Sequence, residues 1–126
     1  MAIDHPNVLI VDDNPTVRAA LRSFLKTRTS AQLCGEASNG VEAIQQAMEQ
    51  KPALILMDLA MPEMNGVEAA NVIKKSLPDT KIIMFTLFPD RVGHLMAKAA
   101  GVDLVVDKEE GTAGLVRVLQ DMLVEN

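Results

Sequence analysis

Short apolar runs alternate along the chain with longer stretches in which apolar residues recur at helical spacing. Most runs are apolar at consecutive positions and stop at a polar residue, which is typical of strands buried on both faces of a parallel sheet. The second run is more polar than the others. The predicted strands are Asn7–Val11, Gln32–Ala37, Ala53–Met57, Lys81–Phe85 and Val102–Val106.

The stretches between and after these runs predict amphipathic helices. Pro15 suits the first position of a helix, with Asn14 or Asp13 as its cap. Asn65 and Glu68 have the spacing of a capping box at the start of another helix. The expected helical segments are Pro15–Lys26, Val41–Met48, the stretch between Asn65 and Pro78, Val92–Ala99, and Leu115–Met122.

The alternation of strands and helices predicts an α/β fold, because each parallel connection needs a crossover. We expect a flavodoxin-like, doubly wound three-layer sandwich, with a five-stranded parallel sheet in the order 2-1-3-4-5 and five helices. A closed eight-stranded barrel would need about 250 residues, and the chain has 126. We therefore expect a single domain over residues 1–126.

Polar residues with chemical potential follow four of the predicted strands. The functional crevice of an open parallel sheet lies beyond the carboxyl ends of its strands, and the expected strand order makes these four ends neighbours. The sequence thus predicts three carboxylates, a hydroxyl and an ammonium group in one place. These residues are Asp12 and Asp13, Asp58, Thr86, and Lys108.

Such a group of carboxylates favours a bound cation. Carboxylates held close together repel one another, so either their pKa values rise or a cation binds. Mg²⁺ prefers one or two carboxylates together with waters and a phosphate oxygen. A carboxylate left free could act as a nucleophile toward a phosphoryl group, with Lys108 pairing with the added oxygens.

At this point the chain resembles the receiver domain of two-component response regulators, and the resemblance covers nearly its whole length. An acidic pair after a strand is weak evidence alone, whereas the stretch that begins at Met57 is specific. The motifs that carry the resemblance are Val11-Asp12-Asp13-Asn14, Met57-Asp58-Leu59-Ala60-Met61-Pro62-Glu63-Met64-Asn65-Gly66, Thr86 and Lys108.

The resemblance implies a role for each acidic residue. Asp58 would be the phospho-acceptor, taking a phosphoryl group from a phosphohistidine of a sensor histidine kinase or a phosphotransfer protein. Asp13 and Asp58 would hold Mg²⁺ with the backbone carbonyl of Ala60, and Asp12 would assist through water. The implied cofactor is therefore Mg²⁺.

The resemblance also implies how the signal is passed on. Thr86 and Lys108 would bind and neutralise the phosphoryl group, and the surface formed by the fourth helix, the fifth strand and the fifth helix would shift. Such a receiver is a signalling protein that catalyses only its own phosphorylation and dephosphorylation. Its output would be a DNA-binding domain or a partner protein.

Three positions depart from the usual receiver pattern. Val105 stands where receivers usually carry an aromatic residue, three positions before the lysine, so signalling is expected to rest on Thr86 and backbone shifts, or on Phe88. Glu109 stands where many receivers have proline, an ending closer to receivers of the NarL/FixJ type. Leu87 is bulkier than the small residue often found there and would narrow access to the phosphate.

Composition limits the partners and the location. The chain has 12 Lys and Arg against 17 Asp and Glu, a net charge of -5, which disfavours direct binding of nucleic acid. No apolar run approaches the length of about 20 residues that a bilayer span needs. The single Cys34 cannot form an internal disulfide, and the N-terminus lacks a signal-peptide pattern, so we expect a cytoplasmic protein.

Several alternatives accompany this interpretation. An FMN site is disfavoured because the first strand-helix turn is Asp-Asp-Asn-Pro rather than Gly-rich. A pseudo-receiver that only docks partners would be expected to have lost Asp58 or Lys108. Val116 and Leu123 lie off the core stripe of the last helix and are either ordinary half-buried residues or the face of a phosphorylation-dependent homodimer. Ending at Asn126, the chain is expected to be a stand-alone receiver or one separated from its output domain.

Overall fold

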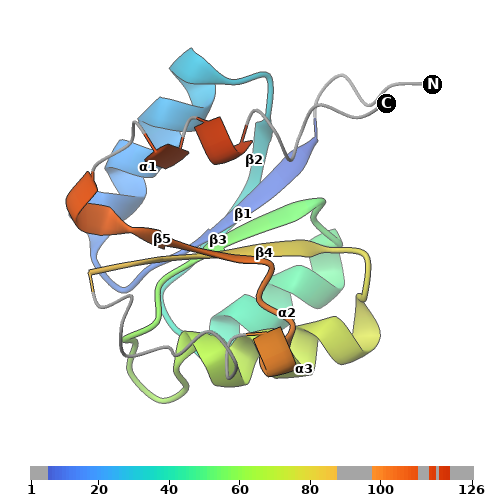
Figure 1. The fold of residues 1–126 in the computed structure, drawn as a ribbon. Helices are drawn as coiled ribbons and strands as arrows, with labels where there is room; N and C mark the ends of the chain where they lie inside the picture. Colours follow the sequence, from blue (N-terminus) through green and yellow to red (C-terminus); the bar gives the residue numbers. More distant parts are fainter. Residues whose placement is uncertain (1–5, 88–97, 111–113, 116, 120–126) are drawn as a thin grey trace.

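The protein is seen here as a computed structural model that describes residues 6–87, 98–110, 114, 115 and 117–119 (Figure 1). Five strands form one parallel sheet in the order β2-β1-β3-β4-β5, which confirms the predicted flavodoxin-like topology. The elements are β1 (Asn7–Val11), α1 (Pro15–Arg28), β2 (Gln32–Ala37), α2 (Gly40–Gln50), β3 (Leu54–Met57), α3 (Gly66–Ser76), β4 (Lys81–Thr86), β5 (Leu104–Asp107) and the 3-10 turn η1 (Lys108–Glu110).

The sheet separates two layers of helix (Figure 1). Helix α1 covers one face together with the helical residues 114, 115 and 117–119, whereas α2 and α3 cover the other together with the helical residues 98–100. These two short segments overlap the predicted fourth and fifth helices, and each extends one residue beyond the predicted bounds, at residues 100 and 114. The rest of those helices, residues 92–97 and 120–122 included, lies outside the described residues.

Alternate residues of each strand supply two separate cores. On β1, Val8 and Ile10 pack on the α1 face, and Leu9 and Val11 pack on the α2 and α3 face. All four are at most 1% exposed, as expected for a sheet covered on both sides. Both cores are mainly aliphatic, and their only described aromatic residues, Phe24 and Phe85, lie on the α1 face.

The helix caps follow from the polar residues before each helix. Asn14, rather than Asp13, caps α1, since its side chain accepts hydrogen bonds from the backbone N–H groups of Thr16 and Val17. Asn65 and Glu68 form the predicted capping box of α3. These caps fix the start of the two helices that follow the acidic ends of β1 and β3.

Strand β5 begins later than predicted. It runs from Leu104 to Asp107. Just before the strand, the side chain of Asp103 accepts a hydrogen bond from the backbone N–H of Ile82 and forms an ion pair with Lys74 at 3.0 Å. The apolar spacing of the predicted helix Val92–Ala99 places Ala99 on its buried face, and this expectation is wrong. Ala99 is exposed and Ala100 is buried, since the helix presents the next position to the core.

No helix among residues 6–87, 98–110 and 114–119, residue 116 aside, is long and apolar enough to cross a membrane.

Candidate functional site

The carboxyl ends of β1, β3 and β5 bring four predicted residues together. Carboxylate oxygens of Asp12, Asp13 and Asp58 lie within 4.8 Å of one another. Lys108, the first residue of η1, places its Nζ 2.6 Å from Oδ2 of Asp12 and 3.4 Å from Oδ2 of Asp58. A single ammonium group therefore bridges two buried carboxylates, while Asp13 is exposed at the rim.

Strand alternation explains why these side chains converge. Asp12 follows Val8 and Ile10 at even spacing, Asp58 follows Leu54 and Leu56, and all these leucine, isoleucine and valine residues face α1. Lys108 likewise lies two positions after Val106, which belongs to the same core. The alternation of the strands thus continues one step beyond the sheet and directs these three polar side chains to the α1 side.

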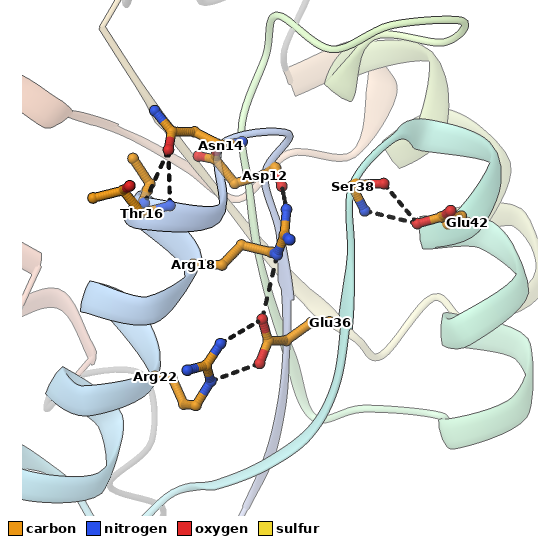
Figure 2. A network of polar contacts seen from close by, with 9 residues as sticks. Asp12, Asn14, Thr16, Arg18, Arg22, Glu36, Ser38 and Glu42 are labelled. Atoms are coloured by element: carbon orange, nitrogen blue, oxygen red, sulfur yellow. Dashed lines mark hydrogen bonds and ion pairs between the residues drawn. The ribbon is translucent and has the colours of Figure 1, made fainter.

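Every polar group of Asp12 has a partner, and Figure 2 shows its contact with Arg18. Its backbone N–H donates to the carbonyl of Ala37, and its carbonyl accepts from Nη1 of Arg18 at 2.7 Å. Its Oδ1 accepts from the N–H of Asn14 and its Oδ2 from Lys108. A carboxylate that is 2% exposed is thereby held in one orientation.

Asp58 is less strongly held. Its Oδ1 accepts from the N–H of Leu59 at 2.8 Å, and its backbone N–H donates to the carbonyl of Val11. Burial raises the pKa of Asp58 above that of an ordinary aspartate; the Lys108 ammonium opposes this rise, and the Asp12 carboxylate adds to it. Burial thus makes the charged form of Asp58 costly, and the Lys108 ammonium offsets part of that cost.

The carboxylates open into a cavity of about 530 Å³. Its polar lining residues are the three aspartates, Asn14, Thr16 and Lys108. Its apolar lining residues include Val17, Ala20 and Leu21 of α1, Phe85 of β4 and Leu87. Ala60 also lines the cavity, and the metal-binding role expected of its carbonyl stays a prediction. An incoming group would therefore reach Asp58 over a partly apolar wall.

Thr86 lies at the end of β4, fully buried and in register with Asp107 of β5. Phe85 and Leu87 line the cavity, whereas Thr86 is not among its lining residues. Leu87 is 51% exposed and lines the cavity, and the narrowing of access expected from it stays a prediction.

Val105 is half-buried in β5, opposite Met84, and packs on the α2 and α3 core. Thr86 lies two positions after Met84 on β4, so its side chain and that of Val105 lie on the same side of the sheet. Phe88, Val116 and Leu123, to which the sequence also drew attention, lie outside the described residues.

The donor set fits Mg²⁺. Mg²⁺ takes oxygen ligands and is usually held by one or two carboxylates, with the remaining positions left to water and phosphate. Here three carboxylates approach one another, two of them contact the ammonium group of Lys108, and the third, Asp13, is exposed and lines the cavity. Asp13 and Asp58, with the carbonyl of Ala60, are suitable ligands, and Asp12 is suitable through water.

Two residues at the site were not predicted from the sequence. Arg18 reaches the carbonyl of Asp12, and the ring of Phe85 lies beneath Lys108, with 5.9 Å between Nζ and the ring centroid. Arg18 follows Asp12 by six positions, a spacing that brings a side chain of the first helical turns back to the strand end, but many exposed arginines share that pattern. Phe85 has the signal of an ordinary core residue.

Comparison with known proteins supports the resemblance that the sequence motifs indicated. The family model for the response regulator receiver domain matches residues 8–120. The response regulator protein VraR of Staphylococcus aureus is 46% identical over 101 residues, which is 80% of this chain and 48% of that protein. The chain spans about half the length of the curated relatives it matches.

Solved structures agree. A LuxR-family two-component response regulator from Aurantimonas sp. SI85-9A1 superposes with a TM-score of 0.87 at 29% identity, covering 94% of this chain and 85% of that one. A LuxR-family DNA-binding response regulator from Staphylococcus aureus gives a TM-score of 0.85 at 26% identity, covering 94% and 99%.

Proposed function

Because this chain belongs to the response regulator receiver domains of two-component systems, of the NarL/FixJ type, we propose that it carries a phosphoryl group on Asp58. The donor is a phosphohistidine of a sensor histidine kinase or a phosphotransfer protein. The observation that supports this most directly is Lys108, whose ammonium bridges Asp12 and Asp58 beside an open cavity. We propose that residues 1–126 form one receiver domain.

The transfer follows from the chemistry of Asp58. A carboxylate oxygen of Asp58 forms a bond to phosphorus while the nitrogen-phosphorus bond of the phosphohistidine breaks, and the imidazole keeps the electron pair and takes up a proton. Lys108 stabilises the charge on the transferring oxygens, since its Nζ is already 3.4 Å from Asp58. Bound Mg²⁺ would supply further neutralisation of the same oxygens. Water later hydrolyses the acyl phosphate.

Asp12 and Asp13 keep the site ready for this reaction. Asp12 is held by its hydrogen bonds and keeps Lys108 in place, and Asp13 at the rim, with Asp58 and the carbonyl of Ala60, would hold the cation. After transfer, the hydroxyl of Thr86 exchanges its present partner for a phosphoryl oxygen. Because Val105 cannot swing as a ring does, we expect the shift to pass through Thr86 and the backbone of β4 and β5.

The output lies on the surface of β5 and its flanking helical segments. Phosphorylation shifts a two-state equilibrium of this surface rather than creating a new one. We propose that the surface controls a DNA-binding domain outside this chain, a partner protein or a homodimer. Two observations support an output of this kind: the matched part of this chain covers only 48% of the curated relative VraR, and one solved relative is named a DNA-binding response regulator. The receiver itself, with a net charge of -5, would not bind nucleic acid, and we place it in the cytoplasm.

Intact mass measurement tests the proposal. Incubation with Mg²⁺ and acetyl phosphate should add one phosphoryl group to the wild-type protein and to Asp79→Asn, which alters an exposed aspartate away from the site. Asp58→Asn should add none, and EDTA should prevent addition in all three proteins. An adduct that persists in Asp58→Asn would refute the assignment, and the absence of any adduct or beryllofluoride response in the wild-type protein would favour a pseudo-receiver.

A further inference from the structure

A hydrogen bond and ion pairs made by arginines of α1 link the acidic site to the edge strand of the sheet (Figure 2). Arg18 of α1 donates through Nη1 to the backbone carbonyl of Asp12 at 2.7 Å, and its Nε lies 3.3 Å from Oε1 of Glu36 on β2. Arg22, one turn further along α1, contacts the same carboxylate through Nε and Nη2 at 2.7 and 3.1 Å. Glu36 therefore binds two arginines, and of these two only Arg18 also contacts Asp12.

The hydrogen bond from Arg18 to the carbonyl of Asp12 restrains the orientation of the main chain at the end of β1. The guanidinium is planar and presents its donors in a fixed fork, so Glu36 on one side determines where the other donor points. That donor meets the carbonyl that joins Asp12 to Asp13. A fixed carbonyl fixes the peptide plane between these two residues and hence the direction from which Asp13 leaves β1.

Arg18 is also better shielded than Arg22. Its side chain is 21% exposed and that of Arg22 is 50% exposed. A hydrogen bond to a charged group gains strength when it is partly withdrawn from water. Arg18 thus has the geometry and the environment to restrain the main chain at the end of β1.

We infer that Arg18 is a positioning residue of the Mg²⁺ site, holding the Asp12-Asp13 peptide so that both carboxylates face Asp58. This inference rests on the proposed function, since it assumes that the carboxylates bind Mg²⁺. Arg18 contacts the ligands' backbone and not the cation. Groups that orient metal ligands in this way change metal affinity by about 10-fold or more when they are removed.

Positioning and simple charge predict opposite results. Arg18 carries a positive charge close to a cation site, so its removal should by electrostatics alone make Mg²⁺ bind more tightly. If Arg18 acts by holding the peptide, its removal makes Mg²⁺ bind more weakly. The sign of the change therefore separates the two explanations.

The experiment is a Mg²⁺ titration of the full chain followed by amide chemical shifts, with thermal unfolding measured in parallel. Arg18→Met should weaken Mg²⁺ binding about 10-fold. Arg18→Lys keeps the charge but loses the fork, and should also bind Mg²⁺ more weakly than the wild type. Arg22→Met removes a contact with the same Glu36 without touching Asp12, and should bind Mg²⁺ as the wild type does.

The outcomes distinguish this inference from the proposed function. If the wild-type protein shows no Mg²⁺-dependent shifts, the proposed function fails with it. If the wild type binds Mg²⁺ and Arg18→Met binds equally or more tightly, the positioning role of Arg18 is overturned and the proposed function stands. An equal weakening in Arg18→Met and Arg22→Met would also overturn it, because the cause would then be the general attachment of α1 to β2.

Discussion

Lys108 lies closer to Asp12 than its proposed role with Asp58 would suggest. Its Nζ is 2.6 Å from Oδ2 of Asp12, a residue 96 positions away in the chain. The lysine thus already has a strong partner before any phosphoryl group arrives. New negative charge on Asp58, 3.4 Å from the same nitrogen, would compete with Asp12 for Lys108, so the two states of the site differ in how one ammonium is shared.

Removing this ammonium should destabilise the protein in a way that a cation can reverse. Lys108→Met leaves the buried carboxylate of Asp12 without its cation, and we expect the free energy of unfolding to fall by about 3 kcal/mol in the absence of divalent ions. Urea unfolding followed by circular dichroism measures this change. Mg²⁺ should restore part of the loss by taking over the neutralisation of the carboxylates.

Lys75→Met serves as the matched control for Lys108→Met, because Lys75 is an exposed lysine of α3. It should leave the free energy of unfolding nearly unchanged with or without Mg²⁺. Equal stability of the two variants would contradict the idea that Lys108 holds the acidic site together.

The raised pKa of Asp58 predicts a pH-dependent stability difference between the wild type and Asp58→Asn. Burial favours the protonated acid in the folded state, so the folded protein binds a proton that the unfolded chain has lost. The stability of the wild type is therefore full below the ordinary aspartate pKa of about 3.9, and it declines as the pH rises through the higher folded pKa. Asp58→Asn lacks this decline.

Without Mg²⁺, Asp58→Asn should accordingly be more stable than the wild type at neutral pH, and the difference should vanish near pH 4. Unfolding curves at a series of pH values, with Asp79→Asn as control, measure it. Mg²⁺ should stabilise the wild type more than the variant. A variant that is less stable than the wild type at neutral pH without Mg²⁺ would show that burial does not dominate the pKa of Asp58.

The acidic site was largely predictable because it depends on topology. Parallel strands in the order 2-1-3-4-5 carry the residues after β1, β3 and β5 to one edge, so Asp12, Asp58 and Lys108 had to meet. Distances between side chains are another matter. The distances from Nζ of Lys108 to Asp12 and to Asp58 differ by less than 1 Å, and strand order does not determine which of the two is shorter.

The sequence also did not show which of two similar neighbouring residues would cap a helix, or which ordinary-looking residues would contact the site. Asn14 and Asp13 are both good helix caps, and the structure uses Asn14 while leaving Asp13 for the cavity. Arg18 and Phe85 resemble an ordinary helix arginine and an ordinary core aromatic. Their importance comes from contacts with Asp12 and Lys108, which lie on other elements.

The ring of Phe85 should contribute to the placement of Lys108 beyond its role in the core. Phe85→Leu keeps an apolar side chain but removes the π face beneath the ammonium, an interaction of about 0.5 to 1 kcal/mol. We expect phosphorylation by acetyl phosphate to slow about threefold, which is the rate equivalent of that energy. Phe24→Leu is the matched control, because Phe24 lies in the same core, 5% exposed, and is not in contact with Lys108.

The comparison between the two phenylalanines isolates the interaction with the cation. Both substitutions should lower the free energy of unfolding, since both leave space in the core. Only Phe85→Leu should slow phosphorylation, and Phe85→Tyr, which retains the ring, should restore the rate. Equal phosphorylation rates in Phe85→Leu and Phe24→Leu would assign Phe85 to packing alone.

Gly66, the first residue of α3, should be required for the position of Asp58. A Cβ atom at Gly66 would collide with the backbone carbonyl of Asp58 and press on Cε of Met84. Backbone cannot move aside as a flexible side chain can, so Gly66→Ala should lower the free energy of unfolding by about 2 kcal/mol and displace Asp58 from Lys108. Urea unfolding and the yield of phosphorylated protein measure the two effects.

Gly35→Ala is the control, because the nearest neighbour of a Cβ atom at Gly35 is Oε1 of Gln46, the end of a flexible side chain. It should cost less stability and leave phosphorylation unchanged; a Gly66→Ala protein that is phosphorylated as fully as Gly35→Ala would show that Asp58 tolerates this displacement.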